Sequence, residues 1–147
     1  MKVLIQRIKQ ARVRVGGETV SESRRGLLLF LGVGSEDGEA DCEKLSQKVS
    51  NLRIFEDEAG KMNLDVKQVS GEILSVPQFT LYADMRKGNR PSFDLSADPQ
   101  KAKLLWERLN ALLRAKGIPV QEGVFGAHME VTLTNDGPAS FLLDSKS

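Results

Sequence analysis

Gly26-Leu27-Leu28-Leu29-Phe30-Leu31-Gly32-Val33-Gly34 contains the longest apolar run of the chain. Glycines bound this run, which is too short for a typical core helix. It also lacks the alternation of apolar and polar residues that marks a strand with one face in water. The segment therefore predicts a strand that is buried on both faces and lies at the centre of a sheet.

The residues before this central segment predict further β structure. Val3–Ile5 and Ala11–Val15 read as two strands separated by polar residues, and Gly16-Gly17 offers a tight turn before Glu18–Val20. In the second of these strands Val13 and Val15 share one face, with arginines on the other.

Two amphipathic helices are expected after the central segment. The first runs from Asp37 to about Leu52, and Asp98 caps the second, which has Pro99 at its first position and stops at Gly117. Their apolar stripes follow helical spacing: Cys42, Leu45, Val49 and Leu52 in the first, and Ala102, Leu105, Trp106, Leu109, Leu112 and Leu113 in the second.

The remaining β signals are a short strand at Ile54-Phe55, a region from Glu72 to Leu81 that contains a proline, and a late hairpin. The hairpin is expected to pair residues 128–134 with residues 141–143 across a turn at residues 135–138. Strands outnumber helices and mostly neighbour one another, so the fold class is α+β, with largely antiparallel sheets and two helices packed outside. We expect one domain over residues 1–147.

Composition narrows the classes of function. The 147 residues carry 21 basic and 20 acidic side chains, so no global field attracts nucleic acid, and we expect no DNA partner. Cys42 is the only cysteine and His128 the only histidine, so we expect no zinc site, no metal and no cofactor. The apolar runs are too short for a membrane span and the N-terminus does not resemble a signal sequence, so the expected location is the cytoplasm.

Familiar catalytic motifs are missing from the sequence. It has no GxxxxGK[ST] phosphate loop, no GxGxxG after a strand and no GxSxG elbow. A histidine-based triad would have to use His128, whose strand position is more typical of a surface or pocket-edge residue.

Pro77-Gln78-Phe79-Thr80-Leu81 is the first of two unusual segments. A proline where a strand would need an N–H donor predicts a bulge or a sheet edge, which would leave the amides of Gln78 and Phe79 free to hold an oxyanion. Thr80 adds a hydroxyl, but no neighbouring base would activate it as a nucleophile.

Asn135-Asp136-Gly137-Pro138 is the second unusual segment, and its residue types alone are those of an ordinary turn. A cis Gly-Pro bond would aim consecutive carbonyls outward, although cis bonds are uncommon. A separate basic segment, Arg86-Lys87-Gly88-Asn89-Arg90, has the composition of a solvated loop or of a local contact with RNA phosphates.

The two unusual segments together resemble the paired signature motifs of the D-aminoacyl-tRNA deacylase family, in the same order and at similar spacing. Further matches extend along most of the chain: Leu4-Ile5-Gln6-Arg7, Gly26-Leu27-Leu28, Arg53-Ile54-Phe55, Gly60-Lys61-Met62-Asn63-Leu64, Arg90-Pro91-Ser92-Phe93 and Gly123-Val124-Phe125-Gly126-Ala127.

The resemblance implies a barrel-like core and a homodimer that binds the acceptor end of an aminoacyl-tRNA. Gly137-Pro138 of each subunit, with the bond cis and Arg7 bracing it, would enter the partner's site and exclude the side chain of an L-amino acid. Gln78, Phe79 and Thr80 would line the pocket and stabilise the oxyanion, and the 2′-hydroxyl of the terminal adenosine would assist water. The expected substrates are D-aminoacyl-tRNA and glycyl-tRNA mischarged on alanine tRNA, with Arg86, Lys87 and Arg90 as candidates for tRNA binding.

Two departures from the family pattern leave alternatives open. Pro77 stands where the family usually has serine, and Ala139-Ser140 replaces the commoner Val-Thr. With a proline before the glutamine, this segment resembles that of a related animal deacylase, which has a trans Gly-Pro bond and accepts L-alanine. The alternatives are therefore a deacylase for L-alanyl-tRNA and a dimeric RNA-binding module without catalysis.

Overall fold

The computed structural model describes residues 1–147. The elements in chain order are β1 (Lys2–Val15), β2 (Glu18–Ser23), β3 (Gly26–Gly32), α1 (Glu39–Asn51), β4 (Phe55–Glu56), β5 (Met62–Leu64), β6 (Glu72–Pro77), the 3₁₀ helix η1 (Phe79–Tyr82), α2 (Pro99–Ala115), β7 (Val120–Glu122) and β8 (Glu130–Asp144).

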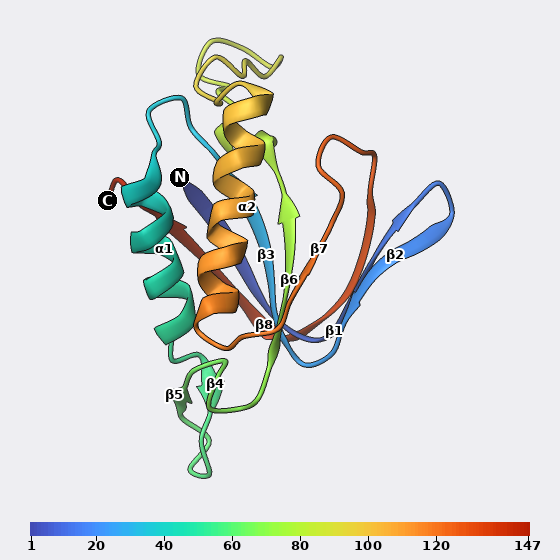
Figure 1. The fold of residues 1–147 in the computed structure, drawn as a ribbon, viewed down its shortest axis with the longest axis vertical. Helices are drawn as coiled ribbons and strands as arrows, with labels where there is room; N and C mark the ends of the chain where they lie inside the picture. The colour runs from blue at the N-terminus through green and yellow to red at the C-terminus, as the bar shows by residue number, and fades with distance from the viewer.

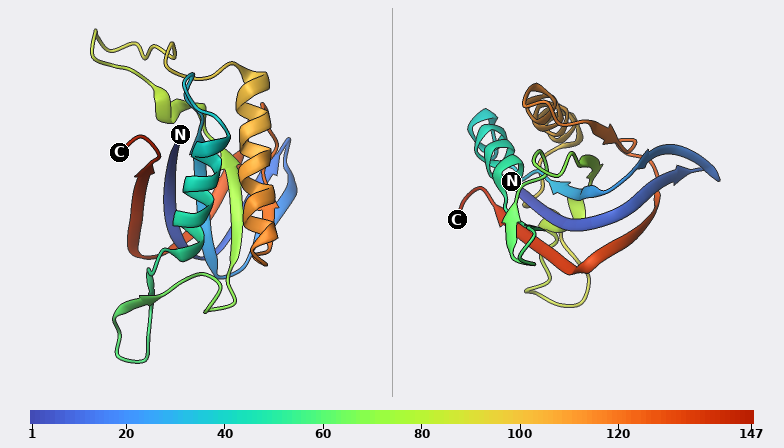
Figure 2. Two further views of the ribbon diagram at one scale, coloured as in Figure 1. Left: turned by 60° about the vertical axis from the view of Figure 1, so that its left-hand side comes forward. Right: turned by 90° about the horizontal axis from the view of Figure 1, so that it is seen from below.

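A six-stranded mixed sheet forms the body of the molecule. Its strand order is β2-β1-β3-β6-β7, and β8 pairs with β1 as well. Strand β1 is antiparallel to β2, β3 and β8, whereas β6 is parallel to both β3 and β7. The sheet curls strongly, and α1 and α2 cover the same face of it (Figures 1 and 2). The α+β barrel-like class with two outer helices is confirmed, with a parallel portion that the sequence did not indicate.

Strand β3 is the central strand that its composition predicts. Six of its seven residues are buried. Leu27, Leu29 and Leu31 pack in the main core between sheet and helices, while Leu28 packs in a second cluster on the other face. Alternate side chains thus enter two separate cores, which explains why this strand contains no polar residue.

Both predicted helices are present, and their ends have visible causes. The Asp98 carboxylate accepts a hydrogen bond from the Lys101 amide at 3.1 Å, and Pro99 begins α2. At the start of α1 the Asp41 carboxylate accepts the Gly38 amide at 2.8 Å. The apolar stripes of both helices lie in the main core, together with Trp106, whose indole N–H donates to Ser75 at 2.9 Å.

The first predicted boundary that is wrong lies inside β1. Residues 3–5 and 11–15 belong to one 14-residue strand, because the polar residues between them continue the ladder with β3 as far as Ile8. Arg7 stays in this strand although it is only 7% exposed, since two carbonyl oxygens accept hydrogen bonds from its guanidinium.

The predicted late hairpin is also wrong. Residues 130–144 form one strand, β8, which pairs antiparallel with β1 on both sides of the Asn135-to-Pro138 segment. Along this ladder Gln6 is opposite Ser140 and Ile8 is opposite Asn135, so the extra β8 residues bulge out of the sheet. The turn-forming residues therefore make a bulge and do not reverse the chain.

The strand predicted from Glu72 to Leu81 ends earlier, at Pro77. Proline has no amide hydrogen to continue the ladder, and the following residues turn into η1. The sequence also left out the short strands β5 and β7 and ended β2 three residues early. Neither helix has both the length and the apolar composition needed to cross a membrane.

Candidate active site

An apolar pocket of about 540 Å³ lies where β3 and β6 end against η1 and the start of α2. Two of the three predicted pocket residues, Gln78 and Phe79, line it, whereas Thr80, the next residue of η1, does not. The remaining lining comes from the ends of β3 and β6, the segment before α2, α2 itself, the segment before β8 and the start of β8, and includes Phe93, Ala97, Trp106, Phe125, His128 and Met129. The pocket thus combines apolar walls with one turn of backbone, as small-molecule sites usually do.

The start of η1 borders this pocket with its backbone. The Gln78 amide donates to the Leu31 carbonyl at 2.7 Å, so the prediction that it is free is wrong. Phe79 and Thr80 begin η1, and the amides of first-turn residues have no acceptor within their own helix. These two amides are the groups that could stabilise an oxyanion.

Thr80 has no activating base. Its hydroxyl is hydrogen-bonded by the side-chain amide of Gln78, a group that cannot take up a proton near neutral pH. No carboxylate or imidazole is hydrogen-bonded to it. The residues around Thr80 therefore provide no group that would activate its hydroxyl as a nucleophile.

Aromatic side chains form the open rim. Phe79 is 56% exposed and meets Phe93 edge to face, with ring centroids 4.9 Å apart. His128 is also exposed, at the lining of the same pocket. Such an exposed aromatic pair suits a planar ring such as a nucleobase.

Gly137 and Pro138 are exposed at the tip of the β8 bulge, and the peptide bond between them is cis. Two side chains, Asn135 and Arg7, hold the bulge. The Asn135 side chain bonds both backbone groups of Ala139, accepting from its N–H at 2.8 Å and donating to its carbonyl at 2.9 Å. Arg7 Nε donates to the Asp136 carbonyl at 2.7 Å, while another guanidinium nitrogen donates to the Ile54 carbonyl at 2.6 Å.

The two motifs do not meet within one chain. Pro77 pairs with Leu31, which is opposite Val3, whereas the bulge lies at the level of Arg7. Four residues of strand separate these levels, about 13 Å, and three strand spacings between β8 and β6 add about 14 Å across the sheet. No residue of the bulge lines the pocket. One chain therefore presents two exposed surfaces at different places, the pocket beside η1 and the β8 bulge. These two surfaces are called the half-sites below.

The predicted basic segment lies in the long loop between η1 and α2, which projects beyond the helices in Figure 1. Arg86 is engaged by Asp84, with nitrogen-to-oxygen distances of 2.8 and 2.9 Å. The side-chain hydrogen bond from Arg86 lowers the pKa of Asp84 to about 2. Lys87 and Arg90 are exposed without an ion pair and are the cations left for an outside partner.

A second groove of about 660 Å³ runs along β1, β2 and β8. Its cations Lys9, Arg12 and Arg24 are interspersed with Glu22 and Glu72. Charges of alternating sign nearly cancel, which is typical of a solvated surface. We assign no role to this groove.

The family model described as D-Tyr-tRNA(Tyr) deacylase matches residues 4–144 of this chain. The chain belongs to this deacylase family. A D-aminoacyl-tRNA deacylase of Thermotoga petrophila is 57% identical over 145 residues, covering 99% of this chain and 97% of the relative. One of Bacillus licheniformis is 51% identical over the full length of both chains.

Two solved structures share the fold of this chain. A structure titled c-Myc DNA Unwinding Element Binding Protein is 39% identical, with a TM-score of 0.93 and 98% of each chain covered. Another, titled as a probable eukaryotic D-amino acid tRNA deacylase, is 20% identical with a TM-score of 0.80 over 97% of each chain, and shows the shared fold alone.

Some residues at the two half-sites of this family member were not singled out from the sequence. Trp106 fits the apolar stripe of α2, and nothing in its spacing separates a pocket wall from core. The Ile54 carbonyl that accepts from Arg7 is a backbone group 47 residues away, for which a sequence has no signal. Asn135 was read as a turn residue, whereas its side chain closes a bulge.

No metal site or reactive thiol emerges from the fold. No three His, Cys, Asp or Glu side chains lie together as a cation site would require. Burial raises the pKa of Cys42 to about 12, so its thiol stays protonated at neutral pH.

Proposed function

We propose that this chain hydrolyses the ester of D-aminoacyl-tRNA, and of glycyl-tRNA mischarged on alanine tRNA, while rejecting L-aminoacyl-tRNA. Membership in the deacylase family supports the reaction class. The pocket beside η1 supports the placement of the ester, because its apolar wall adjoins the start of η1, whose first two amides have no intrahelical acceptor.

The observation that carries the proposal is that the two half-sites are exposed and separate in one chain. In a homodimer, Gly137-Pro138 of one subunit would enter the pocket of its partner beside Gln78, Phe79 and Thr80. A bulge held by Arg7 and Asn135 is a fixed backbone surface. Such a surface can exclude the side chain of an L-aminoacyl group by steric clash, without any attractive contact with a D-aminoacyl group.

The proposed chemistry uses backbone and substrate groups. Water attacks the ester carbonyl, the amides of Phe79 and Thr80 stabilise the developing oxyanion, and the 2′-hydroxyl of the terminal adenosine assists the water. Thr80 supplies no covalent step, in agreement with its single hydrogen bond to Gln78. The proposal assigns no cofactor and no metal.

The proposed partner is the acceptor end of tRNA. The proposed location is the cytoplasm, and residues 1–147 are proposed to form one domain. Lys87 and Arg90 are candidates for phosphate contacts, together with Arg86 if Asp84 releases it. A DNA duplex is a suitable competitor in binding assays, since one solved relative has a DNA element in its title. We expect this duplex to compete poorly with tRNA.

The deciding experiment incubates the purified protein with D-tyrosyl-, glycyl- and L-tyrosyl-tRNA. We expect release of D-tyrosine and glycine and retention of the L ester. Comparable loss of the L ester would reject the chiral filter, and salt-sensitive tRNA binding without any release would favour a non-catalytic module. Mischarged L-alanyl-tRNA belongs in the same assay, because Pro77 favours the related L-alanine editor.

One substitution in the chain and one modified substrate test the mechanism. Thr80→Ala should retain near-normal deacylation, whereas complete loss in a folded protein would favour a nucleophilic threonine. A tRNA ending in 2′-deoxyadenosine should be hydrolysed poorly, and normal hydrolysis would exclude the role of the hydroxyl.

Subunit mixing tests the shared site. A chain with Phe79→Ala and a chain with Gly137→Ala each carry one damaged half-site. A heterodimer of the two contains one intact composite site, so mixing should restore D-specific hydrolysis. Absence of any recovery in a mixture shown to exchange subunits would reject the shared site.

A further inference from the structure

Tyr82 is the last residue of η1, the turn that presents Phe79 and Thr80 to the pocket. Its phenol ring is half-buried against the backbone at the end of β3. The ring therefore connects the turn to the central strand, on the side of η1 that the proposed reaction does not use.

Two glycines make room for this ring. A Cβ atom on Gly34 would lie 2.8 Å from Tyr82 Cε1, and a Cβ on Gly32 would lie 3.2 Å from Cδ2 and 3.0 Å from the Gln78 carbonyl oxygen. Both glycines have ordinary backbone conformations, since neither is among the residues with positive φ. Their lack of a side chain is therefore explained by the close approach of η1 and Tyr82, and not by a turn.

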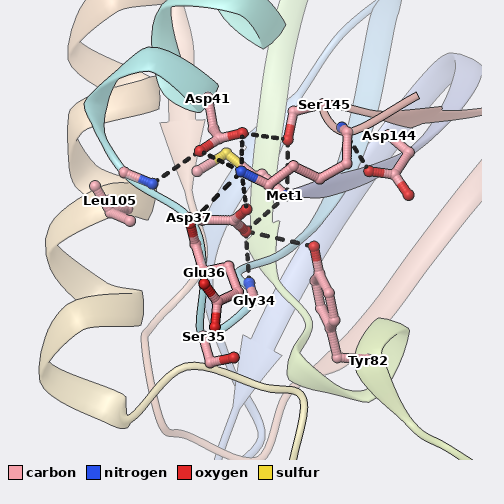
Figure 3. Close-up of polar contacts among 12 residues, drawn as sticks. Met1, Gly34, Ser35, Glu36, Asp37, Asp41, Tyr82, Leu105, Asp144 and Ser145 are labelled. Atoms are coloured by element: carbon pink, nitrogen blue, oxygen red, sulfur yellow. Dashed lines mark hydrogen bonds and ion pairs between the residues drawn. The ribbon is translucent and has the colours of Figure 1, made fainter.

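The polar end of Tyr82 reaches a buried charged cluster, drawn in Figure 3. Its hydroxyl is 3.4 Å from Asp37 Oδ2, which also accepts the Gly34 amide at 2.6 Å and pairs with the Met1 ammonium at 2.6 Å. The Lys2 ammonium lies over the ring, 4.8 Å from its centroid. Contacts to β1, to the end of β3 and to the segment before α1 thus hold one side chain.

Two backbone hydrogen bonds join η1 to the residues that flank it. The Leu81 amide donates to the Gln78 carbonyl at 3.3 Å, and the Ala83 amide donates to Thr80 at 3.1 Å. A four-residue 3₁₀ turn with such bonds does not fix its own orientation. The packing of the Tyr82 ring therefore fixes the orientation of the turn.

We propose that Tyr82 is a positioning residue for the deacylation reaction. Its ring, seated on Gly32 and Gly34, holds η1 so that the amides of Phe79 and Thr80 point at the ester carbonyl. This inference rests on the proposed function. It assigns the ring no contact with substrate.

The first test compares Tyr82→Leu with Tyr82→Phe in steady-state hydrolysis of D-tyrosyl-tRNA. The leucine variant loses the flat ring and should lower kcat roughly 10- to 100-fold, with KM changed less than about threefold, since misplacement of catalytic groups by about 1 Å costs on this order. The phenylalanine variant keeps the ring and should restore kcat to within about threefold of wild type. A kcat for the leucine variant within twofold of wild type would overturn the proposal.

Gly34→Ala gives an independent test, because it leaves Tyr82 in the chain and pushes its ring away. The alanine variant should lower kcat as Tyr82→Leu does, and the double variant should be no worse than Tyr82→Leu alone, because the clash needs the ring. Multiplicative losses in the double variant would mean that the two residues act separately, and would overturn the proposal.

Hydrogen exchange at the Leu81 and Ala83 amides supplies a readout that needs no activity. We expect faster exchange in Tyr82→Leu and Gly34→Ala, with unchanged exchange in the core strands. If wild type fails to hydrolyse D-tyrosyl-tRNA, the proposed function fails. The exchange measurement still tests whether the Tyr82 ring holds η1 in place. Unchanged exchange at both amides would refute the positioning role of Tyr82 even in an active enzyme.

Discussion

Arg7 offers the most quantitative test of how the β8 bulge is held. Its guanidinium is buried and links the Asp136 carbonyl of the bulge to the Ile54 carbonyl of the segment after α1. Arg7→Met keeps most of the apolar stem and removes both donors. The two carbonyl oxygens would then lose their charged hydrogen-bond donor.

The expected loss follows from these two contacts. A hydrogen bond to a charged donor contributes about 1.5–3 kcal/mol, so two of them predict a loss of about 3–6 kcal/mol in the free energy of unfolding. The ion pair with the Asp136 carboxylate adds little, because its closest approach is 3.8 Å and that carboxylate is 34% exposed. The free energy of unfolding of Arg7→Lys should lie between those of wild type and Arg7→Met, since one ammonium cannot reach both carbonyls in the geometry of a guanidinium.

Denaturant unfolding followed by circular dichroism, at one fixed protein concentration, measures this loss. Arg12→Met is the matched control, because Arg12 is an exposed arginine of the same strand without an ion pair, and its loss should stay within about 0.5 kcal/mol. In folded Arg7→Met we also expect the ratio of D- to L-tyrosyl-tRNA hydrolysis to fall about tenfold or more. A loss in stability below about 1 kcal/mol, or an unchanged ratio, would refute the bracing role of Arg7.

Three further predictions concern single positions. Asn110 is fully buried and neither polar atom of its side chain has a partner, so Asn110→Leu, of the same branched shape, should raise the unfolding free energy by about 1–3 kcal/mol in denaturant titrations, and a loss would contradict this account. Burial raises the pKa of Asp41, but hydrogen bonds from Ser145, Gly38 and Lys146 outweigh burial and lower it to about 2. Because this pKa lies below the unfolded value, Asp41 stabilises the fold above about pH 4 by roughly 2 kcal/mol, and this contribution disappears as the pH falls toward 2. Unfolding measured from pH 6 to 2 should therefore show a weaker acid dependence in Asp41→Asn, and an equal dependence would exclude the effect. In Gly137→Ala the new Cβ would lie 2.0 Å from the Ala139 nitrogen, so the bulge must shift, and we expect L-tyrosyl-tRNA to be hydrolysed faster relative to the D ester than in wild type. An unchanged ratio in that assay would argue against the filter.

The sequence by itself determined the features that depend on local periodicity. Residues 26–34 are apolar at every side chain, and β3 indeed places alternate residues in two cores. The Asp98 cap of α2 and the apolar stripes of both helices were equally readable, because a helix forms from contacts three and four residues apart. The paired motifs also indicated the family before any fold was known.

Only the tertiary structure decided how the motif segments are used. Asn135-Asp136-Gly137-Pro138 has the composition of a hairpin turn, yet it is a bulge because β1 continues past it and offers pairing groups on both sides. Pro77 could have sat in an edge strand, but β6 ends there and η1 follows.

The burial of Arg7 has the same origin. Its acceptors lie 47 and 129 residues away and are main-chain carbonyls, which every residue possesses and no sequence pattern marks. The separation of the two half-sites likewise follows from strand order and register. Periodicity specifies which face of an element is apolar, whereas the partner of that face depends on which distant segments pack together.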